Sequence, residues 1–292
     1  MDERYVRSNL SSRFVLSDAT AADYRAFVRL FPELAVPDPL PSAERFAKVI
    51  APQAIFARDG DTIVGYAWSR PRGERLHVVH VITDPAHRRR GVGRALMLEL
   101  SQRAQVAGLR RWMLNVKPEN VAALELYAEC GMKVVLECVQ LRLAWTNIAK
   151  LPKPPANTAI HTLAPSDDSR VEDALGLAPG DFSTCRAFPG RVFLGASGDG
   201  VPLACVVFDP AYPGAPVLRA RSPGHARAVL EGLLPHAPPQ HERLFMLLEG
   251  DPALESTLVG VGAEVTMRML RMEGDVEDVG NAGCSPPAAE RS

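Results

Sequence analysis

The chain has 292 residues, of which 47% are hydrophobic and 23% are charged, and its formal net charge at pH 7 is −1. This length and composition predict two globular domains, each large enough to bury its own core. A net charge so close to zero argues against nucleic acid or an anionic membrane as the partner of the whole surface.

Targeting signals and cysteine pairs are both missing from the sequence. It has no run of about 18 apolar residues, and Met1–Arg4 lacks the charge and the apolar core of a signal peptide. The five cysteines are odd in number, scattered and without the Cys-x-x-Cys spacing of redox and zinc sites. These features predict a cytoplasmic protein with reduced thiols, without a disulfide and without a metal.

The first third of the chain alternates strand and helix signals. Residues 1–12 are predicted to be a frayed terminus and residues 13–16 to be the first strand. Thr20 is expected to cap the helix that follows, with Asp23 as its capping partner. Ser42 is expected to cap a second helix with residues 45–50 as its body.

A hairpin and then a strand-to-helix turn follow. Two apolar runs, residues 54–58 and 63–69, flank Asp59-Gly60-Asp61, which is a hairpin signal. A strand then leads into Arg88-Arg89-Arg90-Gly91-Val92-Gly93-Arg94, after which an apolar helix begins. Two glycines at such a turn let backbone N–H groups face a ligand, and the helix N-terminus and the arginines add positive charge. The turn therefore predicts a binding site for a phosphate or pyrophosphate.

Which phosphate ligand it binds is indicated by family resemblance. The turn lacks the Gly-Lys-Ser/Thr of nucleoside triphosphatases and the third glycine of dinucleotide-binding loops. Arg-x-x-Gly-x-Gly after a strand is instead similar to the coenzyme A pyrophosphate loop of the GNAT superfamily of N-acetyltransferases. Downstream, a strand over 111–116 precedes Asn-x-x-Ala-x-x-x-Tyr-x-x-x-Gly, which spans Asn120 to Gly131 and closely resembles the second GNAT signature. The resemblance covers residues 13–143.

The resemblance implies an α/β fold, with a mixed sheet flanked by helices, and the direct attack of an amine on acetyl-CoA in a ternary complex. In the family, backbone N–H groups of the strand hold the pantetheine and the glycine turn binds the pyrophosphate. The residues at these positions, together with the coenzyme-binding asparagine, are Val81, Ile82, Thr83, Arg88, Arg89, Arg90, Gly91, Val92, Gly93, Arg94 and Asn120. Tyr127 is placed to protonate the departing thiolate.

The general base and the acceptor stay open. His80 is a candidate base because imidazole titrates near neutral pH, with His77 or a chain of waters as alternatives. The acceptor is expected to be a small-molecule amine, with a lysine side chain or a protein N-terminus as the alternative. Two further possibilities are a non-catalytic acyl-CoA sensor, which would leave Tyr127 unexplained, and an interaction protein, which the intact glycine turn disfavours.

The second half resembles the first at a constant offset. A shift of 131 places Gly93 on Gly224 and Gly131 on Gly262, and it also places Arg88 on Arg219. We therefore expect a GNAT domain over 1–147, a Pro-rich linker over 148–157, a second GNAT-like domain over 158–273 and a disordered tail over 274–292.

The copy is predicted to be degenerate. Ser222 and Pro223 replace Gly91 and Val92, and proline removes an N–H group from the turn. At the other motif, Leu258 replaces Tyr127 and Asp251 replaces Asn120. The second domain is therefore expected to support the first or to shape its acceptor cleft.

Overall fold

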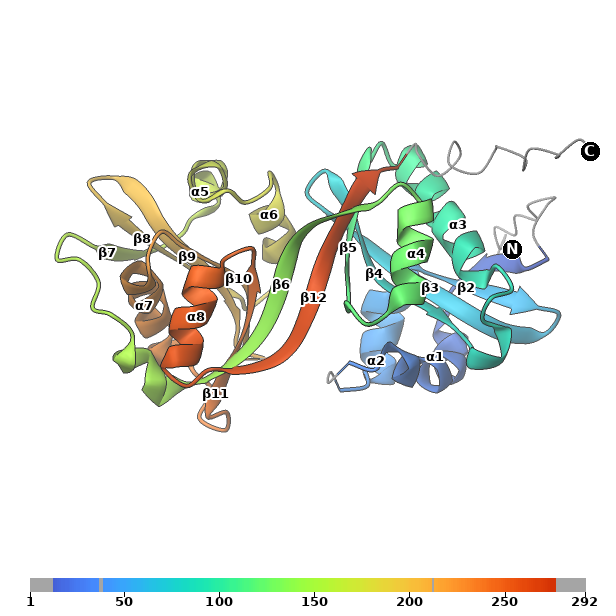
Figure 1. The fold of residues 1–292 in the computed structure, drawn as a ribbon, viewed down its shortest axis with the longest axis horizontal. Helices are drawn as coiled ribbons and strands as arrows, with labels where there is room; N and C mark the ends of the chain where they lie inside the picture. Colours follow the sequence, from blue (N-terminus) through green and yellow to red (C-terminus); the bar gives the residue numbers. More distant parts are fainter. Residues whose placement is uncertain (1–12, 37–38, 212, 277–292) are drawn as a thin grey trace, which may run out of the picture. The chain divides into compact units, whose positions relative to one another are not determined.

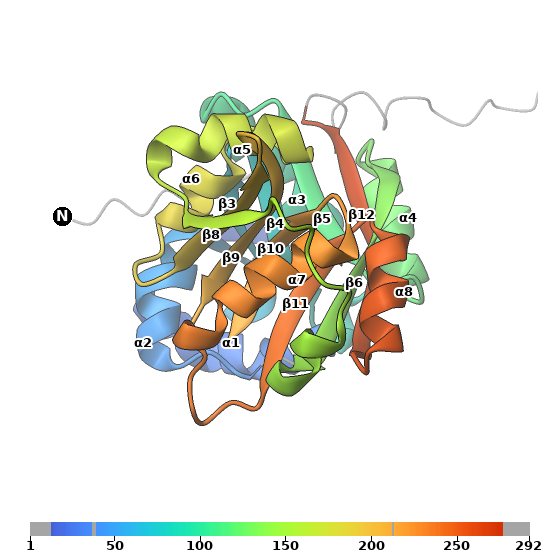
Figure 2. The same ribbon diagram turned by 90° about the vertical axis from the view of Figure 1, so that its left-hand side faces the viewer.

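A computed structural model describes residues 13–36, 39–211 and 213–276 (Figure 1; Figure 2). The chain divides into two compact units. Within the described residues, unit 1 holds the chain up to Pro71, Arg75–Val134 and the stretch from Met272, and unit 2 holds Arg72–Glu74 and Val135–Arg271. In this part of the chain, no helix combines the length and the hydropathy needed to cross a bilayer.

Unit 1 contains a mixed sheet with the strand order β1-β2-β3-β4-β5-β12, which confirms the α/β prediction. Its strands are β1 (Val15–Asp18), β2 (Ala54–Asp59), β3 (Thr62–Arg72), β4 (Arg75–Thr83), β5 (Arg111–Val116) and the end of β12 (Glu264–Asp275). β1, β2 and β3 pair antiparallel, whereas β4 and β5 are parallel. The predicted hairpin is confirmed, and Gly60 at its turn has a φ of +59°, which favours glycine.

Two pairs of helices cover the two faces of this sheet (Figure 1). They are α1 (Tyr24–Leu30) and α2 (Ala43–Arg45) on one face, and α3 (Val92–Val106) and α4 (Val121–Glu129) on the other. Phe27 of α1 packs on the aromatic ring of Tyr66, with ring centroids 5.4 Å apart. Both predicted caps form, since the Thr20 N–H donates to Asp23 and the Ser42 Oγ accepts from the backbone of Arg45.

The body of the second predicted helix differs from the expectation. Residues Phe46–Ile50 form a π-helix rather than a continued α-helix. Its wider turn is closed by the Ala51 N–H, which donates to the carbonyl of Phe46. Phe46 and Ile50 are both buried, so the widened turn still places its apolar side chains in the core of unit 1.

Unit 2 has the strand order β12-β6-β11-β10-β9-β8-β7. Its other strands are β6 (Lys133–Ala144), β7 (Ala159–Thr162), β8 (Val192–Gly198), β9 (Val201–Asp209), β10 (Gly214–Ala220) and β11 (Arg243–Glu249). Its helices are α5 (Asp168–Leu175), α6 (Asp181–Arg186), α7 (Pro223–Gly232) and α8 (Pro252–Gly260). β8 and β9 pair antiparallel as a hairpin.

The 131-residue repeat is visible in the elements. The shift carries α4 onto α8 and β6 onto β12 at both ends, and it carries the first residue of α3 onto that of α7. It fails upstream, because residues 84–91 connect β4 to α3 whereas only residues 221 and 222 connect β10 to α7. Matching Arg88 with Arg219 is therefore wrong, since Arg219 lies within β10.

The last strand of each repeat is exchanged. β6 lies within the predicted first domain over 1–147, but from Val135 onward it belongs to unit 2, where it pairs antiparallel with β11. The end of β12, from Met272, instead follows β5 in unit 1. A hydrophobic pattern predicts that a segment is a strand, but it does not specify which edge the strand joins, so this exchange was not foreseen.

The predicted linker and tail also contribute to the cores. Ile148 and Leu151 are buried in the core of unit 2, so residues 148–157 pack onto this unit. Val276, in the predicted tail, is buried as well. The expectations for residues 1–12 and 277–292 concern residues outside the described part of the chain.

Candidate active site

The two parallel strands of unit 1 pair only where they begin. Arg75, Leu76 and His77 of β4 are in register with Arg111, Trp112 and Met113 of β5. The remainder of β4, which carries His80 to Thr83, lies beyond this paired stretch and leads to the turn before α3. Its β5-facing backbone groups are therefore available to a ligand.

Alternation along β4 decides which backbone groups face β5. The Asp84 N–H donates to the carbonyl of Val64 on β3 at 2.9 Å, and the Ile82 carbonyl lies beside Gly65 of the same strand. Because successive residues of a strand direct their N–H groups to opposite sides, Val81 and Thr83 face β5 and Ile82 faces β3. Of the three predicted pantetheine contacts, the geometry thus favours Val81 and Thr83.

The turn between β4 and α3 is held in place by side chains that the motif does not include. Asp84 accepts a hydrogen bond from the Ala86 N–H at 3.0 Å and forms an ion pair with Arg29 of α1. Arg29 also donates to the carbonyl of Ile63 at 2.6 Å. These contacts link the first helix, β3 and the start of the turn.

Two left-handed residues shape the rest of the turn. Arg89 has a φ of +61° and Gly91 a φ of +89°, and Gly91 caps α3. The Ala95 N–H donates to the Gly91 carbonyl at 3.0 Å, so the N–H groups of Val92, Gly93 and Arg94 come before the helical ladder. No described atom lies within 4 Å of a Cβ placed on Gly91. The turn is thus open, and it suits a pyrophosphate.

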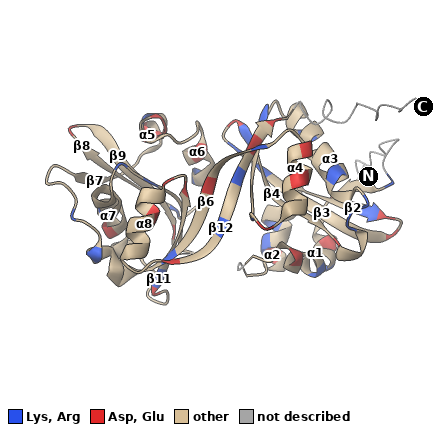
Figure 3. Cartoon of the chain, viewed as in Figure 1, with Lys and Arg blue, Asp and Glu red and all other residues tan. Residues whose placement is uncertain are grey.

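The arginine side chains around this turn are exposed and form surface ion pairs. Arg88 contacts Glu33 at 2.5 Å, Arg89 contacts Glu125 at 3.7 Å and Arg94 contacts Glu129 at 3.6 Å. Arg94 lies on α3, and Glu125 and Glu129 lie on α4, the helices on which Figure 3 shows blue basic and red acidic segments. Exposed pairs of this kind contribute about 0–1 kcal/mol, so a pyrophosphate can displace them at small cost.

The second motif lies on α4, next to the turn. The Asn120 side chain caps the helix by accepting a hydrogen bond from the Ala123 N–H at 3.3 Å, which leaves its amide N–H groups able to bind a ligand. A Cβ on Gly93 would lie 2.9 Å from Leu126 and 3.9 Å from the Thr83 hydroxyl. Gly93 therefore allows the end of β4, the start of α3 and the middle of α4 to meet.

Tyr127 follows Leu126 on this helix, and its side chain is 8% exposed. Burial, with a smaller contribution from Cys130, raises the pKa of its hydroxyl far above the ordinary value. The phenol is therefore protonated at neutral pH, which is the state that a general acid requires.

His80 lies on β4 among aromatic side chains. Its Nδ1 is 3.2 Å from the buried Tyr66 hydroxyl, and its ring centroid lies 5.0 Å from that of Trp68 and 5.9 Å from that of Phe31. Burial lowers the pKa of His80 to about 4, so the imidazole is neutral at pH 7. His77, the alternative base, lies at the last paired position of β4, opposite Met113.

Tyr66 is a site residue that motif analysis missed. It lies on β3, two residues before Trp68, and residues at this spacing share one face of a strand. This spacing was the only signal in the sequence that related the two aromatic side chains. Their proximity to His80 depends on the pairing of β3 with β4, which no local pattern specifies.

The counterpart of the glycine turn in unit 2 is filled. Ser222 caps α7 through its Oγ, which accepts from the His225 N–H at 3.3 Å. A Cβ on Gly224 would lie 2.8 Å from the carbonyl of Lys153, so the chain itself covers this helix end. Leu258, at the position of Tyr127, is buried in the core. These contacts agree with the predicted loss of coenzyme binding.

The two turns give a paired prediction. In Gly91→Ala, the left-handed φ strains the new side chain by about 1–2 kcal/mol, and we expect acetyl-CoA binding to weaken by about 5- to 30-fold. In Gly224→Ala, the new Cβ meets Lys153, and we expect unit 2 to lose about 1–3 kcal/mol of stability with unchanged acetyl-CoA affinity. Titration calorimetry and thermal denaturation of both variants test this. Equal acetyl-CoA affinities of Gly91→Ala and the parent chain would contradict it.

One known protein family matches the first half of the chain. The family model for the acetyltransferase (GNAT) family matches residues 21–132. N-alpha-acetyltransferase RimI of Mycobacterium tuberculosis is 36% identical over 123 residues, which cover 40% of this chain and 76% of the relative. Mycothiol acetyltransferase of Amycolatopsis mediterranei is 33% identical over 85 residues, which cover 26% of this chain and 28% of the relative.

Solved structures resemble the chain over nearly its whole length. A GCN5-related N-acetyltransferase from Sphaerobacter thermophilus has a TM-score of 0.65 at 17% identity, covering 91% of this chain and 96% of that one. A tandem GNAT protein from the clavulanic acid biosynthesis pathway has a TM-score of 0.56 at 18% identity, covering 90% and 98%. At these identities, the likeness shows the tandem fold alone.

The open glycine turn, the unpaired end of β4 and the sequence matches together define an N-acetyltransferase. The chain belongs to the acetyltransferase (GNAT) family.

Proposed function

We propose that the chain transfers the acetyl group of acetyl-CoA to the primary amine of a small molecule, by direct attack within a ternary complex. The observation that carries this proposal is the open turn at Gly91, which lies beside the unpaired end of β4. Unit 1 thus has space for a pyrophosphate and free backbone groups for the pantetheine, whereas the matching turn in unit 2 is filled.

In the proposed mechanism, N–H groups of Val92, Gly93 and Arg94 bind the pyrophosphate, and the exposed guanidinium groups add charge. Backbone groups of Val81 and Thr83 hold the pantetheine and orient the thioester carbonyl. Asn120 is proposed to bind the coenzyme with the amide N–H groups that capping does not use.

The proton steps are assigned to two side chains. Tyr127 gives its proton to the sulfur as the carbon–sulfur bond breaks, so coenzyme A leaves as a thiol rather than a thiolate. The amine loses a proton as its bond to the carbonyl carbon forms, and His80 is proposed to accept that proton. A neutral imidazole can accept it, and the low pKa of about 4 favours its rapid release to water.

The alternative acceptor is a protein N-terminus. It is supported by RimI, a relative whose name describes an N-alpha-acetyltransferase and which is 36% identical over 123 residues. The small-molecule acceptor is supported by the match to mycothiol acetyltransferase. Thiol release from acetyl-CoA should be measured with a panel of small amines and with peptides that carry free N-termini. Turnover with peptides alone would favour the alternative, and no turnover with either class would refute acetyl transfer to amines.

The order of binding is tested by initial rates. Direct attack predicts double-reciprocal plots that intersect as the amine concentration varies. Parallel lines, together with acetylated enzyme in a mass spectrum taken without amine, would show a covalent intermediate and would overturn the ternary complex.

The low pKa of His80 gives a prediction for pH dependence. Between about pH 5.5 and 8.5, kcat/KM should rise with pH as the alkylamine acceptor, with a pKa of about 10.4, loses its proton. His80 is already neutral in this range, so no inflection near the ordinary imidazole pKa of about 6.5 is expected. An inflection there that disappears in His80→Gln would contradict the assignment.

A further inference from the structure

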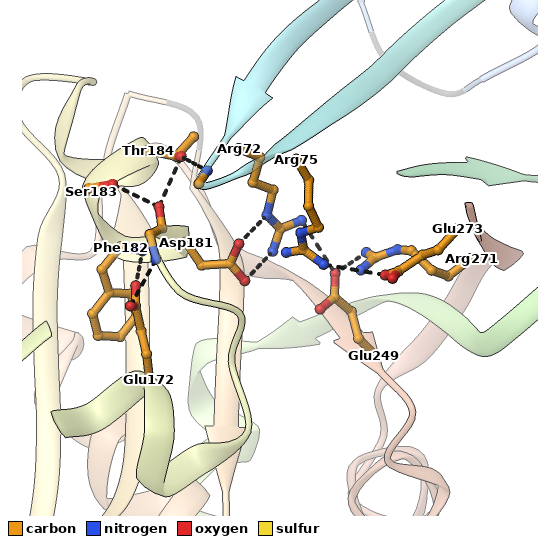
Figure 4. Close-up of polar contacts among 12 residues, drawn as sticks. Arg72, Arg75, Glu172, Asp181, Phe182, Ser183, Thr184, Glu249, Arg271 and Glu273 are labelled. Atoms are coloured by element: carbon orange, nitrogen blue, oxygen red, sulfur yellow. Dashed lines mark hydrogen bonds and ion pairs between the residues drawn. The ribbon is translucent and has the colours of Figure 1, made fainter. Parts of the chain in front are cut away.

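Unit 2 contains a short segment from the first half of the chain. Arg72–Glu74, the turn that joins β3 to β4, belongs to this unit, while the rest of both strands belongs to unit 1. Figure 4 shows the turn among side chains of α6 and of the strands β11 and β12. Farther from the turn, β3 carries Tyr66 and β4 carries His80.

The turn is bound on its α6 side. The Arg72 guanidinium donates two hydrogen bonds to the Asp181 carboxylate, from Nε at 2.9 Å and from Nη2 at 3.1 Å. The Gly73 N–H donates to the Thr184 hydroxyl at 3.0 Å. Gly73 has a φ of +57°, and a Cβ there would lie 2.1 Å from the Pro179 carbonyl, so only glycine fits this approach.

A second carboxylate lies on the other side of Arg72. Glu249 is 3.7 Å from Arg72, 2.5 Å from Arg219 and in contact with Arg271. The Arg72, Asp181, Glu249 and Arg271 side chains are each at most 12% exposed. Burial alone would raise the pKa of Glu249, but the three arginines outweigh it and hold this pKa at about 2. Glu249 is therefore charged at neutral pH.

The cluster occupies the part of unit 2 that matches the coenzyme cleft. Among the described residues, β10 and β11 pair in parallel at Gly214 and Ala215, at the start of β10, as β4 and β5 pair where they begin. Arg219 lies near the end of β10 and Glu249 ends β11, so their ion pair bridges the region beyond this pairing. The second repeat has filled its cleft with charged side chains, one of which is Arg72.

We propose that the degenerate repeat acts as a socket for the β3–β4 turn, with Arg72 as a positioning residue for the acetyl-transfer site. Both strands leave a fixed turn, so the socket limits how far β4 can shift relative to β3. The position of β4 relative to β3 places the His80 ring beside the Tyr66 hydroxyl and directs the backbone N–H groups of Val81 and Thr83 toward β5. The inference rests on the proposed function only for its effect on turnover.

Hydrogen exchange of the full-length protein tests the socket without relying on turnover. In Arg72→Met, we expect the β4 amides that face β3, those of His80 and Ile82, to exchange at least tenfold faster than in the parent chain. Arg191→Met is the matched control, because Arg191 is as buried as Arg72 and also forms an ion pair within unit 2, that with Asp209. Unchanged exchange in β4, or an equal increase in the control, would overturn the proposal.

Steady-state kinetics give a second readout. We expect kcat of Arg72→Met to fall at least tenfold while KM for acetyl-CoA changes less than threefold, because the pyrophosphate turn lies at the far end of β4. Arg72→Lys keeps the charge without the paired donors, and it should recover part of both effects. If Arg72→Met does not fold, Arg72→Lys takes its place in both measurements. A parent chain without turnover would refute the proposed function, whereas the exchange result would still decide the socket.

Discussion

Tyr127→Phe is expected to lower kcat by about 10²–10⁴, with the affinity for acetyl-CoA nearly unchanged. The phenol is buried on α4 and protonated at neutral pH. It is the group proposed to give a proton to the departing sulfur. Without its proton, coenzyme A must leave as a thiolate, which costs more as the carbon–sulfur bond breaks. The ring itself remains, so the packing of α4 on the sheet is preserved.

Three measurements separate this role from a structural one. Titration calorimetry gives the affinity for acetyl-CoA, and the steady-state rate of thiol release gives kcat. Thermal denaturation reports the packing of unit 1. Loss of kcat alone supports a general acid. A matched loss of affinity and turnover would indicate that the hydroxyl positions α4, and an unchanged kcat would remove Tyr127 from the proton step.

Features that depend on neighbouring residues could be predicted from the sequence. The predicted strand over 111–116 matches β5, and the helix that carries Tyr127 begins at its Asn120 cap. The same holds for the turn at Gly91, since a left-handed glycine before an apolar helix is a local property. Such signals are independent of the partner that each element finds.

Features that depend on distant partners could not be predicted. The low pKa of His80 requires Tyr66, Trp68 and Phe31 to surround it, and these residues come from other elements. Arg219 matched Arg88 in the sequence because one offset was applied across a shortened connection. The β3–β4 turn gave no sign of its partners, since Asp181 lies 109 residues away in the chain.

The exchange of strands predicts that unit 1 depends on the end of the chain. A chain ending at Arg271 lacks Met272 and Val276, which are both buried, and burial of such side chains contributes about 1.5–3 kcal/mol each. It also lacks the bonds from the Val276 N–H to the Arg110 carbonyl and from the Ser101 hydroxyl to the Val276 carbonyl, each worth about 0.5–1.5 kcal/mol. The total loss, about 4–9 kcal/mol, approaches the whole stability of an ordinary domain.

A chain that ends at Val276 is the matched control, because it keeps all of these contacts. We expect it to retain its melting temperature and its acetyl-CoA binding, whereas the chain that ends at Arg271 should lose cooperative unfolding of unit 1 and bind no acetyl-CoA. Glu273→Gln separates charge from strand pairing, since Glu273 contacts Arg75 of β4 and Arg111 of β5, each at 3.3 Å. The glutamine keeps the shape of the side chain and an amide oxygen that can accept from either arginine, so this change should matter far less than loss of the strand. If the chain ending at Arg271 still bound acetyl-CoA and unfolded cooperatively, unit 1 would not need β12, and the first repeat would fold from its own sequence.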